Sequence, residues 1–113
     1  MTIEDAHDLI PEEIADRIPR LYATERVADP VVHVKLFTPD SSWTWLITEY
    51  APEQRLAFGR ADGHESELGY ISIDELESVR GPLGLKVERD LHWRPAKLSE
   101  ITTPAGPEGP APG

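Results

Sequence analysis

Apolar and polar residues alternate on both sides of a short turn in the middle of the chain. Residues 31–50 have the sequence VVHVKLFTPDSSWTWLITEY, in which residues 39–42 (Pro-Asp-Ser-Ser) are typical of a tight turn. Counted outward from that turn, the expected cross-strand pairs are Thr38 with Trp43, Leu36 with Trp45, Val34 with Ile47, and Val32 with Glu49. The pattern therefore predicts an antiparallel β-hairpin.

The two faces of this hairpin differ in composition because side chains alternate along a strand. One face is predicted to form the core and to hold both tryptophans; it consists of Val32, Val34, Leu36, Trp43, Trp45 and Ile47. The opposite face is mixed and consists of His33, Lys35, Phe37, Thr44, Leu46, Thr48 and Tyr50. A register shift of one residue would exchange the two faces.

A helical pattern precedes the hairpin. Ile10, Ile14 and Ile18 follow at four-residue intervals, which places them on one side of a helix. Pro11 suits the first turn, where its missing N–H loses no hydrogen bond. The helix is expected to run to Pro19, whose ring prevents continuation.

A second helix is predicted to begin at Ser72. Ser72 and Glu75 form the capping box S-x-x-E, in which each side chain accepts from the other residue's backbone N–H. Arg80 is expected in the last turn and Gly81 just beyond it as the C′ residue, followed by Pro82.

Further strands are expected at residues 56–60, 68–71 and 87–93, where apolar residues alternate or cluster. These elements predict an α+β fold: an antiparallel sheet of four or five strands with an N-terminal helix and a second short helix packed on it. A chain of 113 residues suffices for one core, so residues 1–101 are expected to form a single domain. The Pro/Gly-rich residues 102–113 are expected to be disordered.

The net charge of −10 narrows the possible partners. Residues 1–16 and residues 62–77 each contain six acidic residues and no lysine or arginine. This balance argues against direct nucleic-acid binding, which depends on basic side chains at phosphates. The acidic start argues against a signal peptide, and no apolar run approaches the roughly 18 residues of a membrane span, so a cytoplasmic location is expected.

No motif predicts catalysis, a metal or a cofactor. Cysteine is absent, and the histidines (His7, His33, His64 and His92) have no helical zinc spacing. The stretch DGHESE at 62–67 lacks the ligand pattern of a calcium loop. In RGPLGLK at 80–86 the glycines follow a helix instead of opening one, which excludes a phosphate-binding loop.

Binding residues are therefore sought among exposed aromatic, cationic and hydroxyl side chains. Trp43 and Trp45 could stack on bases, but their neighbours favour a place in the core. The remaining candidates lie on the other hairpin face, at the second helix end and on the last strand: His33, Lys35, Phe37, Thr44, Tyr50, Arg80, His92 and Arg94.

Three segments resemble a known bacterial family. They are VADPVVHVKLFTPDSSWTWLITEY at 27–50, ELGYISIDELESVRGPLGLKVERDLHW at 67–93 and PAKLSEI at 95–101. They are similar to domain of unknown function 2958, over about residues 17–101. The resemblance implies a short bacterial protein, often encoded on plasmids or other mobile elements near conjugation or antirestriction genes, and it implies no activity. Residues 1–16 and the tail are expected to be extensions outside the family core.

Three functions agree with these observations. The first is an accessory protein–protein interaction module with a protein partner, which fits a compact domain without a reaction motif. The second is an acidic DNA mimic or antirestriction accessory, which the two acidic segments would support. The third is a small ligand-binding protein or hydrolase with a pocket between helix and sheet.

Overall fold

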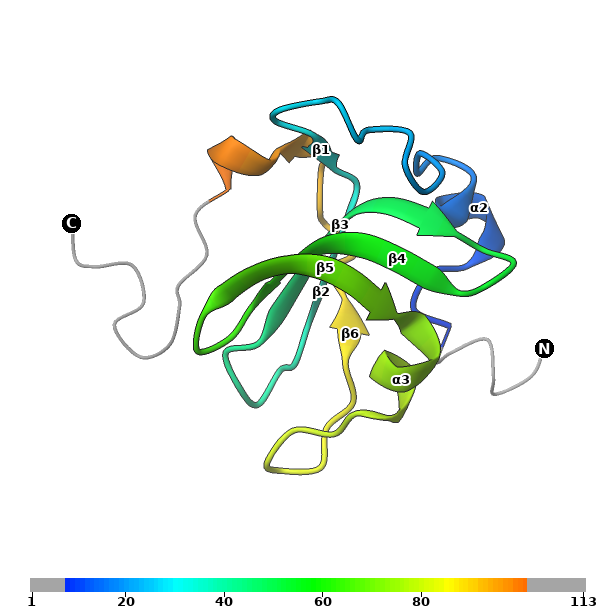
Figure 1. Ribbon diagram of the computed structural model, residues 1–113. Helices are drawn as coiled ribbons and strands as arrows, with labels where there is room; N and C mark the ends of the chain where they lie inside the picture. Colours follow the sequence, from blue (N-terminus) through cyan, green and yellow to red (C-terminus); the bar gives the residue numbers. More distant parts are fainter. Residues whose placement is uncertain (1–7, 102–113) are drawn as a thin grey trace.

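The computed structural model describes residues 8–101, which form two antiparallel sheets and short helices (Figure 1). In chain order the elements are α2 (Glu12–Ala15), β1 (Val31–Val32), β2 (Val34–Phe37), β3 (Thr44–Ala51), β4 (Leu56–Asp62), β5 (Ser66–Ser72), α3 (Ile73–Ser78), β6 (Glu88–Arg89), β7 (Ala96–Lys97) and a 3-10 turn, η1 (Leu98–Glu100). The main sheet has the order β5-β4-β3-β2-β6, and β1 pairs with β7 in a second sheet. The predicted α+β class is confirmed. Residues 102–113, which are expected to be disordered, lie outside the described residues, and so does His7.

The β2–β3 hairpin has the predicted register over most of its length. Leu36 pairs with Trp45 and Val34 pairs with Ile47. The turn is closed by the N–H of Thr38, which donates to the carbonyl of Trp43 over 3.1 Å. The alternation around residues 39–42 thus identified both strands and their partners.

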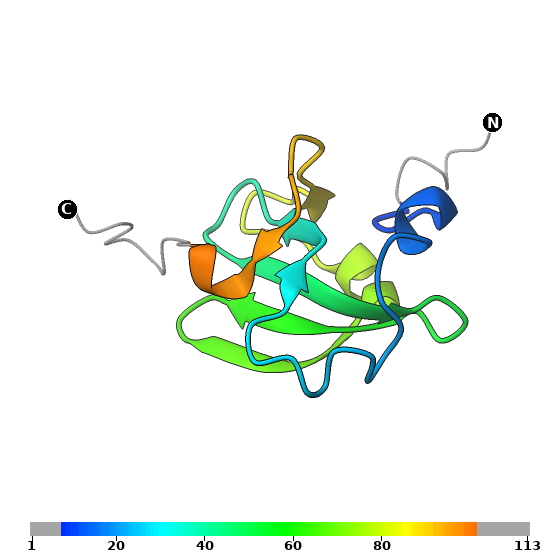
Figure 2. The same cartoon turned by 90° about the horizontal axis from the view of Figure 1, so that it is seen from above.

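The pairing of Val32 with Glu49 is wrong. Val32 belongs to β1 and pairs with Ala96 of β7, while the N–H of His33 donates to the carbonyl of Ile47 over 2.9 Å. In chain order, the chain therefore passes at His33 from the second sheet into the main sheet. Figure 2 shows the β1–β7 pair with η1 toward one end of the sheet and α2 toward the other.

A β-bulge at Thr48 reverses the expected orientation of the end of β3. The register with β4 shifts between Ile47 and Glu49, so that Glu49 pairs with Phe58 and Tyr50 with Ala57. An extra residue in one strand exchanges the two faces beyond it. Tyr50 consequently lies in the core with Ile47, and its predicted place on the mixed face is wrong.

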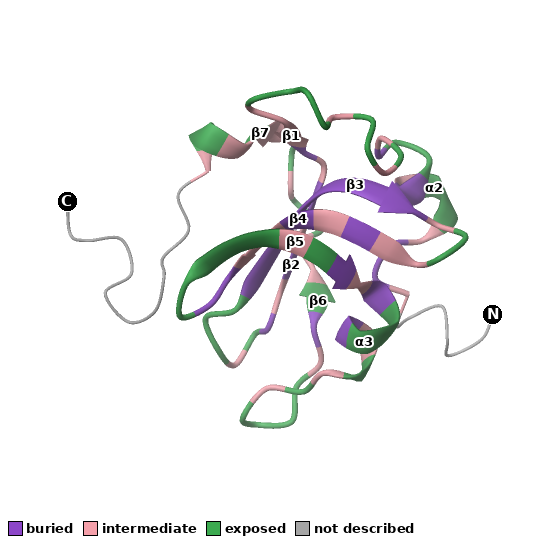
Figure 3. Ribbon diagram, viewed as in Figure 1, coloured by how far each residue is buried: buried purple, intermediate pink, exposed green. Residues whose placement is uncertain are grey.

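The two tryptophans have different environments. Trp45 is 8% exposed and belongs to the core, as predicted, whereas Trp43 is 38% exposed, so its predicted core position is wrong. Trp43 is the last residue before β3 begins, at the margin of the sheet, where fewer neighbours cover it. Figure 3 shows that β3 is buried along its length, while β5 is largely exposed.

Both helices are shorter than predicted. α2 ends at Ala15, and two i→i−3 hydrogen bonds then lead to Ile18, which is buried in the core. Beyond these tighter turns, the carbonyl of Pro19 accepts from the N–H of Tyr50 over 2.9 Å. The α-helix thus ends before Pro19, and the segment that follows it is bonded to β3.

In α3 the predicted start is confirmed and the predicted end is wrong. The hydroxyl of Ser72 accepts from the N–H of Glu75 over 3.2 Å. The helix ends at Ser78, because Val79 is extended and Arg80 forms a bridge with Lys86. The left-handed glycine of the following loop is Gly84, with φ of 85°, rather than the expected residue 81.

The predicted strand at 87–93 is mostly a loop. Only Glu88 and Arg89 pair with β2. The N–H of Asp90 still donates to the carbonyl of Lys35, and a turn then carries the chain away, closed by the N–H of Trp93 and the carbonyl of Asp90. His92 and Arg94 therefore do not lie on a sheet.

Candidate functional site

Three predicted binding residues line one shallow hollow. Lys35, Phe37 and His92 border a hollow of about 380 Å³ beside β6, and His33 lines a neighbouring hollow of about 200 Å³. The ammonium of Lys35 lies 5.8 Å from the ring centroid of Trp93, so its charge already has an aromatic partner.

The other four predicted residues do not join them. Thr44 and Tyr50 are buried. Arg80 is exposed and donates to two backbone carbonyls at the end of α3. Arg94 is exposed on the segment after the last turn. The predicted residues therefore do not form a single site.

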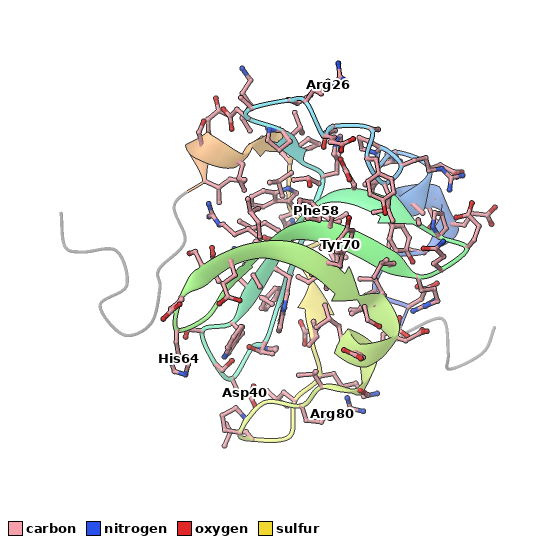
Figure 4. The ribbon with its side chains drawn as sticks, viewed as in Figure 1. Arg26, Asp40, Phe58, His64, Tyr70 and Arg80 are labelled. Carbon is pink, nitrogen blue, oxygen red and sulfur yellow. The ribbon has the colours of Figure 1, made fainter. Side chains whose placement is uncertain are left out.

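The structure contains an exposed apolar cluster that the sequence reasoning missed. We call it the outer patch, and its members are Tyr22, Phe58, Leu68 and Tyr70. Phe58 pairs with Tyr70 across β4 and β5, and their rings meet edge to face with centroids 5.2 Å apart. Figure 4 shows both side chains on the same side of these strands.

Exposure of the outer patch is high for residues of this size. Tyr22 is 61% exposed, Leu68 is 62% exposed and Tyr70 is 55% exposed. A signal in the sequence could have found two of them: Leu68 and Tyr70 alternate with Ile71, so a strand that buries Ile71 must turn them to the opposite face.

The position of Tyr22 is set by Glu49, which the bulge places on this face. The carboxylate of Glu49 accepts from the N–H of Tyr22 over 2.7 Å, from the N–H of Thr24 over 2.8 Å, and from the Thr24 hydroxyl. Tyr22 has φ of 73°, a backbone conformation that needs such support. A side-chain hydrogen bond with Tyr22 raises the pKa of Tyr70 above its ordinary value, as does burial to a lesser degree.

The second acidic segment is partly neutralised by arginines. Asp62 is buried and accepts two hydrogen bonds from Arg60, over 2.9 and 3.1 Å. Arg55 forms ion pairs with Asp74 over 2.6 Å and with Glu77 over 2.5 Å. Half of the six acids in residues 62–77 therefore have a cationic partner.

The largest of four hollows in residues 8–101 is lined by charges of both signs. It measures about 830 Å³ and lies between α2 and β6, next to Asp8, the first described residue. Its charged lining is mixed, with Glu12, Glu13 and Glu77 near Lys86 and Arg89. Arg89 donates to the carbonyl of Leu9 over 2.6 Å, so part of this wall holds the N-terminal segment in place.

Residues 8–101 include no group of three or more His, Asp or Glu side chains placed to hold a metal ion. Within the same range no helix has the length and apolar character needed to cross a membrane.

Burial lowers the pKa of His33 below its ordinary value. The unfolded chain therefore takes up a proton on this residue first as pH falls, and stability is lost below about pH 6.5. We expect the His33→Gln variant to lose less free energy of unfolding than the wild type between pH 7.5 and 5.5, measured by urea denaturation at each pH. His92→Gln, at an exposed histidine, is the control and should keep the wild-type pH slope. An unchanged slope in His33→Gln would contradict this assignment.

Comparison with known proteins gives one match. A family model described as "protein of unknown function (DUF2958)" matches residues 9–109. It extends beyond the resemblance at residues 17–101 on both sides, so α2 and part of the tail are not extensions outside the family. No curated protein and no solved structure matches.

Proposed function

The chain belongs to the DUF2958 family, and we propose that it acts by binding another protein through the outer patch. The observation that supports the proposal is that Tyr22, Leu68 and Tyr70, each more than half exposed, gather beside Phe58 on one face. Contiguous exposed apolar side chains on a small domain mark interaction surfaces, and tyrosine is enriched in them.

The patch lies at the edge of the main sheet. Among residues 8–101, β5 pairs only with β4 and is an edge strand, to which a partner strand could add by backbone hydrogen bonds. A partner could therefore combine side-chain burial on Leu68 and Tyr70 with backbone hydrogen bonds along β5.

The patch is also held in shape before binding. β4 and β5 pair without a register shift along their whole length, from the pair of Leu56 with Ser72 to the pair of Asp62 with Ser66. Glu49 fixes the loop that carries Tyr22. A surface whose side chains are already ordered loses little entropy when it binds.

The alternatives receive less support from the geometry. A DNA mimic needs unpaired carboxylates, and arginines bind three of the six acids in residues 62–77. A hydrolase or ligand-binding protein needs converging polar groups in a defined pocket. The largest of the four hollows lies between α2 and β6 but has a charged lining of mixed sign, and the three smaller ones border α2, β6 or the turns of the sheet. The bacterial, mobile-element and cytoplasmic setting stays a prediction.

Photo-crosslinking in the native host tests this proposal. A photoreactive phenylalanine analogue at position 70 should capture a defined protein, while the same analogue at position 13, on α2, should not. The captured partner is then purified, and its affinity is measured by calorimetry for the wild type and for Leu68→Ala and Tyr70→Ala. Each variant is expected to bind at least about tenfold more weakly, because truncation of a central interface residue costs more than about 1 kcal/mol.

Both variants should keep the wild-type melting temperature within a few degrees, since these side chains are mostly exposed. Crosslinking that is equal at positions 13 and 70, or an affinity unchanged in both variants, would contradict the proposal.

A further inference from the structure

A second surface lies on the opposite face of β4 and β5, where two turns meet. Thr44 pairs with Asp62, so the β2–β3 turn and the β4–β5 turn adjoin at the same end of the sheet. Between them is a hollow of about 280 Å³, which we call the tryptophan hollow; it is lined by Trp43, Ala61, His64, Glu65 and Glu67.

The aromatic wall of this hollow is held in a fixed orientation. Trp43 stacks on the buried Trp45, with centroids 5.9 Å apart and planes at 23°. His64 meets it edge-on, with centroids 6.2 Å apart and planes at 81°. On a further side the indole packs against Gly63, where a β-carbon would lie 2.4 Å from ring atoms. Trp43 is therefore packed against three neighbours, and it is still 38% exposed and lines the hollow.

The charged groups of the lining are both carboxylates. Glu67 pairs with Ala61, which in turn pairs with Trp45, so Glu67 lies on the tryptophan side of the sheet. Glu65 follows His64 in the β4–β5 turn and is exposed like Glu67. Figure 4 shows the position of His64 at this turn. An electron-rich indole and two negative charges thus border one small space.

We infer that the tryptophan hollow binds a cationic side chain of a partner polypeptide, specifically that of arginine. A cation over an indole is attracted by the ring quadrupole, and a carboxylate beside it adds a charge-assisted hydrogen bond. The planar guanidinium of arginine can stack on the indole while its edge donates to a carboxylate, which the ammonium of lysine cannot do. The hollow has room for one such side chain.

This inference goes beyond the proposed function, because the hollow and the outer patch lie on opposite faces of the same strands. Ala61 and Glu67 pair on one face, and Arg60 and Leu68 pair on the other. Each surface can therefore bind or fail to bind independently.

Titration followed by nuclear magnetic resonance tests the inference. The probe is the peptide acetyl-Gly-Arg-Gly-amide, added to the full chain, and the signal is the indole N–H of Trp43. The control probe contains citrulline, which has the shape of arginine without its charge. The arginine peptide should shift the Trp43 signal to saturation, whereas the citrulline peptide should shift it little. The shift should also weaken as salt is added.

Three variants locate the binding. Trp43→Leu removes the aromatic wall and Glu67→Gln removes one charge, and each should weaken the arginine peptide about fivefold or more. For Trp43→Leu the signals of Glu65 and Glu67 report binding. Glu13→Gln removes the same charge on α2 and should leave the affinity unchanged. Glu67→Gln keeps the test valid if Trp43→Leu lowers stability.

Equal shifts with arginine and citrulline would overturn the inference, as would an affinity unchanged in Glu67→Gln. A loss of affinity in Tyr70→Ala as large as that in Trp43→Leu would also overturn it, because binding would then not be specific to the hollow.

Discussion

Trp45→Ala is expected to lower the free energy of unfolding by about 4 kcal/mol, and Trp43→Ala by only about 1 kcal/mol. Trp45 packs in the core between Leu36 and Ala61 of the neighbouring strands, and its removal leaves a cavity. Trp43 is 38% exposed, so its truncation loses mainly the stack on Trp45.

Urea denaturation followed by far-ultraviolet circular dichroism measures both losses without relying on tryptophan fluorescence. Small domains are stable by about 5–15 kcal/mol, so Trp45→Ala is expected to be partly unfolded at 37 °C if the wild type lies near the lower limit. Similar losses in the two variants would contradict the assignment of Trp45 to the core and Trp43 to the surface.

Glu49→Ala is expected to lower the free energy of unfolding by about 3 kcal/mol. The side chain is 4% exposed and accepts from the N–H groups of Tyr22 and Thr24, which lose a charged acceptor when it is removed. The loop that carries Tyr22 should become mobile, so amide hydrogen exchange at Tyr22 and Thr24 should accelerate more than exchange in β4.

Glu53→Ala is the matched control for this variant. Glu53 forms an ion pair with Arg20 over 2.9 Å, but both side chains are mostly exposed, so the pair contributes little. The loss of unfolding free energy in Glu53→Ala should be much smaller than that in Glu49→Ala. A loss as large as that of Glu49→Ala, or unchanged exchange at Tyr22, would show that burial of Glu49 does not support the loop.

Local patterns in the sequence determined several features correctly. The pairing of Leu36 with Trp45 follows from counting outward from one tight turn. Ser72 begins α3 because its hydroxyl accepts from the backbone N–H of Glu75, three residues further along the chain. These features depend on groups only a few residues apart. The α+β class and the family follow from the same local patterns and their order along the chain.

The residues of the candidate sites were harder to predict from the sequence. The alternation of Leu68 and Tyr70 was readable, but Tyr22 joins them from a loop that is distant in sequence, through Glu49. Trp43 was assigned to the core because alternation gives the direction of a side chain. It does not give the number of neighbours that cover a side chain at the margin of a sheet.

The sequence by itself thus determined the strands of the central hairpin, the approximate positions of β4 and β5, and which family the chain belongs to. Only the tertiary structure decided which side of the sheet the end of β3 faces. The bulge at Thr48 places Tyr50 in the core and Glu49 under the loop of Tyr22, with the N–H of Tyr50 bound to the carbonyl of Pro19. A single inserted residue reverses the faces beyond it, and the contacts that favour the insertion come from segments about 25 to 30 residues away in sequence.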